Sequence, residues 1–288
     1  MAFVTFVAAL SVPGFAQSPD PPPTVTGTIS NVTRVETWRF FEPFPEAGTN
    51  PDYTFVGDRA ELGARVRGVR FDLAAAFNYV RLENLPVDAI GPGGLGTGAF
   101  YFASSGERYS YQLYLSEATL RAKSREGRWA VTLGRGHHES GHEAPVALPA
   151  LDTLMRERLG ARLVGDFEYS FYQRRFDGVR VDVDRPRWHV TGAAFVPTQG
   201  GFEESTNLSM LKLQVATGAA TFRPQGVASP SAWQAFSHVY RDRREVQARP
   251  DNIGQVDPTA IVNVTVAAVG GSYAAVRPTR AGEFDTVV

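Results

Sequence analysis

Polar and apolar residues alternate along residues 59–82, and this alternation predicts two long β-strands joined by a tight turn at Gly68. Side chains of a strand point alternately to its two faces. The first run therefore carries its charged side chains on one face, namely Arg59, Glu61, Arg65 and Arg67. The second run carries large apolar side chains on one face, namely Val69, Phe71, Leu73, Phe77 and Tyr79. Both runs approach or exceed the roughly nine to eleven residues that a tilted strand needs to cross a bilayer. We interpret them as membrane-spanning strands.

The same pattern recurs along the chain. Strands are predicted at residues 28–40, 53–67, 69–82, 109–123, 128–135, 166–183, 187–196, 208–222, 232–242 and 260–269. The connections after the second, fourth and sixth strands are short, while those after the first, third, fifth and seventh are long. The long connection 136–165 contains a predicted short helix within residues 148–163, because Leu151, Leu154 and Leu159 recur at helical spacing. Outer-membrane barrels have this asymmetry, with short periplasmic turns and long extracellular loops. The predicted fold class is all-β, an antiparallel transmembrane β-barrel of the outer-membrane type.

The ends of the chain suggest further divisions. Residues 2–12 are apolar, and small residues at Gly14 and Ala16 predict a secretory signal peptide, residues 1–16, cleaved after Ala16. The alternative is a hydrophobic arm of the mature protein. Residues 17–27 form a proline-rich spacer, and residues 28–288 form the barrel domain. Residues 283–288 resemble the beginning of another strand, so we expect a partial barrel that is truncated at its C-terminus.

Composition excludes several functional classes. The net charge is −1, cysteine is absent, and there is no apolar run of the roughly 18 residues that a spanning helix needs. The chain has 27 arginines and only two lysines, which either reflects a GC-rich genome or a use of guanidinium groups to bind carboxylates. Near-neutral charge argues against a nucleic-acid partner. The glycines between Gly91 and Gly98 lack the lysine and helix of a phosphate-binding loop, and no cofactor is indicated.

Three segments resemble the alginate-export family of outer-membrane porins. They are Leu115–Leu120, Trp129–Arg135 with its Leu-Gly-Arg ending, and Arg174–Arg180 with the pattern Arg-x-Phe-Asp-Gly-Val-Arg. The resemblance covers roughly residues 28–270 and implies a monomeric barrel of about eighteen strands, of which about ten or eleven are present here. It also implies a location in the outer membrane of a Gram-negative-type bacterium, in contact with its lipid, and an arginine-lined lumen that exports an anionic, alginate-like polysaccharide. Gly136 stands where the family usually has glutamine, which leaves the solute open.

The predicted substrate pathway consists of charged residues assigned to the lumen. They are Arg34, Glu36, Arg59, Glu61, Arg65, Arg67, Arg70, Asp72, Arg121, Arg135, Arg175, Asp177 and Arg180. A charged side chain that faces lipid at mid-membrane costs about 2 to 4 kcal/mol, so an inward orientation is expected. Guanidinium groups would attract carboxylates there, and interleaved acids would keep binding weak. The alternative is a network of ion pairs that only fills the lumen.

One competing signal is the sequence His138-Glu139-Ser140-Gly141-His142, which matches the H-E-x-x-H pattern. On a helix this spacing places two imidazoles on one face to bind zinc, with the glutamate as general base. Here glycines surround the motif, and the segment before it reads as a strand. A secreted zinc-dependent hydrolase is therefore the alternative function, with His138 and His142 as the candidate ligands. The preferred prediction is a channel that is not an enzyme and holds no catalytic metal.

Overall fold

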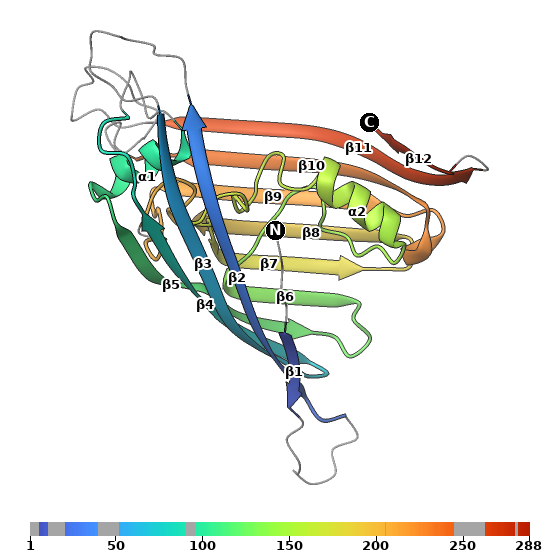
Figure 1. Cartoon of the computed structure of the whole chain (residues 1–288). Helices are drawn as coiled ribbons and strands as arrows, with labels where there is room; N and C mark the ends of the chain where they lie inside the picture. The colour runs from blue at the N-terminus through green and yellow to red at the C-terminus, as the bar shows by residue number, and fades with distance from the viewer. Residues whose placement is uncertain are drawn as a thin grey trace.

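A computed structural model describes residues 6–10, 21–39, 52–89, 96–204, 206–244, 263–279 and 282–288. They form one antiparallel sheet of twelve strands, in which each strand pairs with its neighbours in the chain (Figure 1). The first six strands are β1 (Phe6–Leu10), β2 (Thr24–Arg39), β3 (Asp52–Arg67), β4 (Phe71–Glu83), β5 (Ser110–Lys123) and β6 (Trp129–Gly136). The other six are β7 (Phe176–Asp184), β8 (Trp188–Pro197), β9 (Leu213–Phe222), β10 (Ser231–Asp242), β11 (Val264–Thr279) and β12 (Gly282–Val287).

The sheet curves round a concave inner face (Figure 1), and side chains on its two faces differ in exposure. On β4 the residues Asn78, Val80 and Leu82 are completely buried on the inner face, while Phe71 and Phe77 are about half exposed on the outer face. Because β2 to β5 have 13 to 16 residues each, they are long enough to cross a bilayer. Long strands with a large apolar outer face are typical of outer-membrane barrels.

The connections alternate in length, as the sequence predicts. At one end of the strands lie short turns, and the β3–β4 turn is closed by a 2.9 Å bond from the Gly68 amide to the Phe71 carbonyl. The β9–β10 turn at the same end contains the 3-10 helix η2 (Gly226–Ala228). The long connections begin and finish at the other end of the strands. They include the helix α1 (Thr97–Ser105), between β4 and β5, and the helix α2 (Pro149–Arg158), between β6 and β7.

Residues 137–175, which join β6 to β7, fold back along the inner face of the sheet, and we call them the inserted segment. They reach the short-turn end, where the Ala147 amide donates to the Val227 carbonyl at 2.7 Å. Helix α2 packs Leu151, Leu154 and Met155 against inner-face residues of β10 and β11. In Figure 1 this helix lies on the concave side. The inserted segment therefore crosses the interior from one end to the other.

A second apolar cluster fills the interior near the long-loop end. Phe55, Tyr101, Tyr114, Phe171 and Tyr172 pack together there, from β3, α1, β5 and the inserted segment. The Tyr101 hydroxyl accepts a 3.0 Å bond from the Phe171 amide. This cluster fills the interior next to β2 to β5 at that end of the sheet.

The observed boundaries correct four sequence predictions. Strand β2 begins at Thr24, inside the predicted spacer, because the alternation continues through residues 24–27. Residues 166–175 are not a strand, since they belong to the inserted segment and bond to one another, as in the 2.8 Å bond from the Arg174 amide to the Asp166 carbonyl. Strand β9 begins at Leu213, and β11 extends to Thr279. Helix α1 was not predicted, because glycines at its start are unfavourable for a helix.

Strand β1 lies within residues 1–16 and pairs with Val25–Ile29 of β2. Cleavage after Ala16 stays a prediction. Strands β1 and β12 stand at the two ends of the strand order, and no pairing between them is found among the described residues. Within that same part of the chain, no helix is long and apolar enough to cross a membrane.

Candidate functional site

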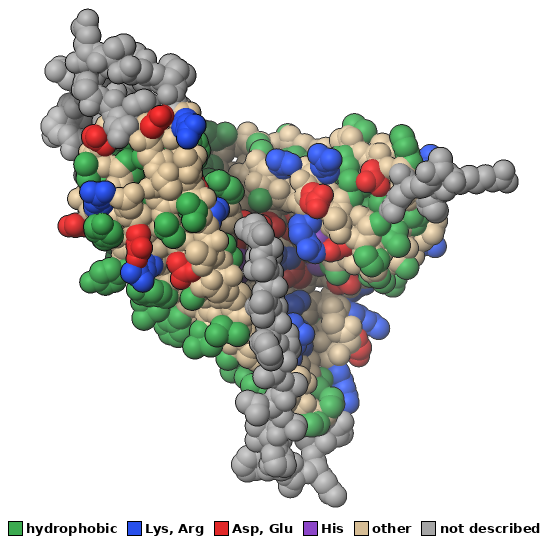
Figure 2. All heavy atoms as spheres, viewed as in Figure 1, with side chains coloured by type: hydrophobic (Ala, Val, Ile, Leu, Met, Phe, Trp, Pro, Cys, Tyr) green, Lys and Arg blue, Asp and Glu red, His purple; other side chains and the backbone are tan. Residues whose placement is uncertain are grey.

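A polar cavity of about 720 Å³ lies between the inserted segment and the inner faces of β3 to β8. Figure 2 shows acidic, basic and histidine side chains gathered in this hollow, while apolar side chains cover the outer flank of the strands. Five basic side chains line the cavity, namely Arg65, Arg67, Arg121, Lys123 and Arg180. Six carboxylates also line it, namely Asp72, Glu117, Glu143, Asp152, Asp182 and Asp184. Basic and acidic groups are thus nearly balanced.

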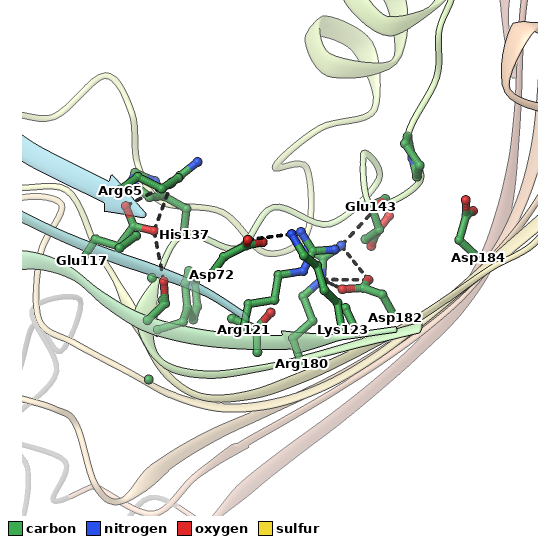
Figure 3. Close-up of a pocket in the computed structure, with 18 of the residues that line it drawn as sticks. Arg65, Asp72, Glu117, Arg121, Lys123, His137, Glu143, Arg180, Asp182 and Asp184 are labelled. Atoms are coloured by element: carbon green, nitrogen blue, oxygen red, sulfur yellow. Dashed lines mark hydrogen bonds and ion pairs between the residues drawn. The ribbon is translucent and has the colours of Figure 1, made fainter. Parts of the chain in front are cut away.

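Three of the basic side chains are paired with carboxylates across or along the strands (Figure 3). Arg65 donates to both oxygens of Glu117 at 3.2 and 3.3 Å. Lys123 Nζ lies 2.6 Å from Asp72 Oδ1. Arg180 binds Asp182 at 2.9 Å. These pairs hold long side chains against the wall, because charge-assisted hydrogen bonds restrict their rotation.

The two remaining cations, Arg67 and Arg121, flank Asp72 in the sheet. Arg67 is in register with Asp72 on one side, and Arg121 is in register with it on the other. The carboxylate of Asp72 is engaged by Lys123. Neither Arg67 nor Arg121 has an ion-pair or hydrogen-bond partner among the residues that the structure describes. Both guanidinium groups are exposed to the cavity and can bind a soluble anion.

The inserted segment forms the opposite wall of the cavity. Its Glu143 carbonyl accepts a 3.2 Å bond from Arg180, and the Glu143 carboxylate accepts a 2.8 Å bond from Gln234 of β10. Completely buried Arg223 anchors the segment at the short-turn end, because it donates to the Pro145 carbonyl at 2.5 Å and to Asp184 at 2.7 Å. The position of this wall is therefore set by contacts with three different strands or turns.

Several predicted pathway residues hold the interior together and do not line the cavity. Arg34 binds Glu36 at 2.6 Å and stacks on Tyr169 at 4.2 Å. Glu36 accepts a 2.6 Å bond from Thr97 of α1. Arg59 donates to the Ser170 carbonyl at 3.0 Å. These side chains point inward as expected, but they fasten α1 and the inserted segment to β2 and β3.

Arg175 is also buried in the interior. Its side chain contacts Asp166 at 3.4 Å and Gln173 at 2.7 Å. Its Nε donates at 3.0 Å to the carbonyl of Ser116, the extra residue at a bulge where Ala76 faces Glu117 and Phe77 faces Leu115. The bulge exposes a strand carbonyl to the interior and so gives the guanidinium a partner. Arg175 is a structural anchor and lies outside the cavity lining.

Arg135 and Asp177 differ from their predicted orientation. They face each other across β6 and β7, with a bidentate pair at 2.7 Å for both bonds. Their neighbours Gly134, Gly136, Phe176 and Gly178 line the cavity, so strand alternation places this pair on the outer face. Ser209 and Asn207 of the β8–β9 connection contact Arg135 there at 3.3 and 3.2 Å. Pairing neutralises charges that the sequence pattern assigned to the lumen.

Two further residues of the predicted pathway, Glu61 and Arg70, do not line the cavity. Glu61 lies on the inner face of β3, between Arg59 and Arg65, by the alternation of that strand. Arg70 lies in the β3–β4 turn and not on a strand, because β4 begins at Phe71. The Arg70 carbonyl accepts a 2.8 Å bond from the Lys123 amide.

The H-E-x-x-H motif lies in a loop after β6 and is not helical. His138 is buried between Phe176 and Phe195 and bonds to Thr217 at 3.2 Å, whereas His142 bonds to Asp152 at 2.8 Å. Burial, reinforced by Arg180, lowers the pKa of His138 to about 4. Burial and the carboxylates of Glu168 and Asp166 raise the pKa of Glu139 to about 7. No group of three possible metal ligands occurs in the described ranges. The hydrolase alternative is therefore not supported.

Sequence reasoning missed several cavity residues. Glu117 and Lys123 share the face of Arg121 by simple alternation on β5, so the pattern alone could have found them. His137, His142, Glu143 and Asp152 come from the inserted segment. No periodic signal could place them, because a loop has no regular side-chain direction.

Comparison with known proteins gives distant likeness only. No protein-family model matches the sequence, and no curated protein matches it. A solved structure, the high-pH structure of Pseudomonas putida OprB, is similar with a TM-score of 0.47 and 14% identity. The likeness covers 88% of this chain and 61% of that chain. At this identity and TM-score the likeness assigns neither a family nor a solute.

The described sheet itself defines a class of fold. Its strands are antiparallel, each pairs with its sequence neighbour, and exposed large apolar side chains lie on the outer face from β4 to β11. Turns are short at one end and long at the other. The fold is therefore a β-barrel sheet of the outer-membrane type.

Proposed function

We propose that the protein is a passive channel that passes an anionic solute across the outer membrane of a Gram-negative-type bacterium. The observation that carries this proposal is the exposure of Arg67 and Arg121 to a charged cavity, while nearby Asp72 is engaged by Lys123. Unpaired guanidinium groups attract anions, and the surrounding ion pairs keep the binding weak enough for release. The alternative, a network of ion pairs that only fills the lumen, accounts for Arg65 and Arg180, which are paired. It does not account for Arg67 and Arg121.

Aromatic residues on the outer face support a membrane location. Trp188, Phe222, Trp233 and Tyr273 are adjacent in the register across β8 to β11, near the short-turn end. The Trp233 and Tyr273 rings lie 4.3 Å apart. Trp188, Phe222 and Trp233 are each exposed by more than two fifths. Rows of aromatic side chains at this level are typical of the boundary between lipid and water.

The solute we propose is an alginate-like polysaccharide. Support comes from the three sequence segments that resemble alginate-export porins, together with guanidinium groups that suit carboxylates. We propose that the protein acts as a monomer, with lipid as its outer partner. It is proposed to have no nucleic-acid partner and no enzymatic activity.

The test is ion selectivity in planar bilayers. We expect the purified protein to prefer anions in a salt gradient, and the double variant Arg67→Glu/Arg121→Glu to lose that preference or prefer cations. Arg128→Glu is the matched control, because Arg128 is an exposed residue next to a short turn and does not line the cavity. Unchanged selectivity in the double variant would contradict the proposed pathway.

The solute is tested separately. Oligouronates added on one side should reduce the current through the unmodified channel in a concentration-dependent way, since their carboxylates compete for the guanidinium groups. Neutral oligosaccharides of equal length are the control. Equal reduction by both sugars would contradict an anionic polysaccharide and would leave the general channel function in place.

A further inference from the structure

The short turn between β7 and β8 carries two arginines at the end of the sheet. They are Arg185 and Arg187, on either side of Pro186, and we call them the turn arginines. The Arg185 amide donates to the Trp188 carbonyl at 2.8 Å and closes the turn. Both arginines therefore have fixed backbone positions next to the first residue of β8.

The Arg185 side chain is held on the outer side of this turn. Its guanidinium carbon lies 5.8 Å from the centre of the Trp188 ring, which belongs to the outer face. Its Nη1 donates to the carbonyls of Arg128 at 3.0 Å and of Asp184 at 2.8 Å. Its Nε and Nη2 make no hydrogen bond or ion pair with any residue that the structure describes. These two nitrogens form an edge of the guanidinium that can bind two oxygens of one anion.

The carboxylates near this turn are engaged by other side chains. Glu126 of the neighbouring β5–β6 turn lies 3.7 Å from Arg128. Asp184 lines the cavity and is bound by buried Arg223 at 2.7 Å. The Arg187 side chain is exposed, and it has no ion-pair partner within the described part of the chain. The positive charge of the turn arginines is therefore not neutralised by the protein.

The turn arginines lie at the level where the aromatic residues of the outer face end. Trp188 directly follows Arg187, and Trp129 is the first residue of β6 at the same end of the sheet. Both indoles are more than two fifths exposed. Tryptophans in such positions mark the boundary between lipid and water, where the lipid headgroups lie. Side chains just beyond them, toward the turn, are therefore level with the phosphate groups of phospholipids.

We propose that Arg185 and Arg187 bind the phosphate groups of anionic phospholipids in the leaflet at the short-turn end of the sheet. The free edge of Arg185 binds one phosphate through two hydrogen bonds, and Arg187 adds charge beside it. This inference rests on the proposed membrane location and is independent of the solute. Lipid is the occupant that the position favours, because Arg185 lies over an outer-face ring, whereas Arg67 and Arg121 are on the inner face.

The experiment measures which lipid contacts this end of the protein. The full chain is inserted into vesicles of phosphatidylcholine and phosphatidylglycerol, and one of the two lipids carries bromine atoms that quench tryptophan fluorescence. Trp129, Trp188 and Trp233 are exposed at the short-turn end, while Trp38 bonds to Glu36 in the interior. Quenching therefore reports lipid contact near the turn arginines. We expect phosphatidylglycerol to bind there at least about twofold more strongly than phosphatidylcholine, because arginines near the surface attract anionic lipid.

Two variants and a control test the assignment. The double variant R185Q/R187Q should bind the two lipids about equally, because it removes both charges. R185K keeps the charge but has no planar edge for phosphate, so it should lose at least about half of the preference. It also serves as the test where the double variant does not fold. The matched control R81Q/R108Q removes two exposed arginines at the long-loop end and should keep the full preference.

The outcomes separate this inference from the proposed function. A preference that persists in either variant, or that the control also loses, overturns the inference. Equal binding of both lipids to the unmodified protein overturns it as well and leaves the channel function in place. A double variant that keeps its lipid preference but is blocked less by oligouronates assigns the turn arginines to the solute and overturns the lipid site. Absence of quenching by either lipid contradicts the membrane location itself.

Discussion

Asp166 and Arg175 form an ion pair in which both side chains are completely excluded from solvent, with 3.4 Å between Oδ2 and Nη1. The pair lies where the inserted segment returns to β7. It joins the segment to the sheet, because Arg175 also binds the Ser116 carbonyl on β5. The interior of this protein is therefore organised by a buried charge pair as well as by apolar packing.

Removing one member of this pair should destabilise the protein strongly. We expect Arg175→Met to lower the free energy of unfolding by about 3 to 5 kcal/mol, since it leaves the buried Asp166 carboxylate without its cation. Urea titration in detergent micelles measures this. The matched control is Arg128→Met, which breaks an exposed contact with Glu126 and should cost less than about 1 kcal/mol. Equal effects of the two changes would contradict the anchoring role.

Adjacent residues on β4 test which face of the sheet meets lipid. Leu73 is half exposed, and strand alternation places its side chain on the outer face and that of its neighbour Ala74 on the inner face. We expect Leu73→Arg to cost about 2 to 4 kcal/mol in a bilayer, because the charge faces hydrocarbon. Ala74→Arg should cost clearly less, because its guanidinium reaches the aqueous cavity. Reversible unfolding from lipid vesicles gives both values, and the opposite order would reverse the assignment of the faces.

His138 should make stability depend on pH. Its pKa is about 4 in the folded protein, below its ordinary value of 6.5, because burial disfavours the charged form. Between these values the unfolded chain binds more protons, so stability rises with pH. The stabilisation is complete above about pH 6.5 and declines as the pH falls toward 4, by at most about 1.4 kcal/mol per unit. His138→Gln should flatten this slope relative to the unmodified protein. Parallel pH profiles would show that His138 does not cause it.

Much of the fold could be predicted from the sequence, since strand alternation is a local property. The hairpin of residues 59–82, the short turns and helix α2 were all predicted and are confirmed with shifts of a few residues. Predictions failed where the chain leaves the sheet. Residues 166–175 have strand-like composition, but Asp166 and Arg175 find their partners in the interior and not in a neighbouring strand.

The candidate site was only partly predictable. Alternation correctly places Arg65, Arg67, Asp72, Arg121 and Arg180 on the cavity face. The sequence prediction also assigned Arg135 and Asp177 to the lumen, whereas the observed register of β6 and β7 places them on the outer face. The sequence did not show that His137, His142 and His189 line the same cavity. His189 lies far from the other two in the sequence, and only the folded chain brings all three to one cavity.

The sequence by itself determined the strands and which side chains share a face, because a period of two residues is set by backbone geometry alone. Tertiary structure decided what those faces do. It directed residues 137–175 back into the interior, paired some arginines with buried acids, and left Arg67 and Arg121 open to the cavity. The physical reason is that a charged side chain takes its role from its nearest partner, and partners distant in sequence meet only when the sheet curves around the inserted segment.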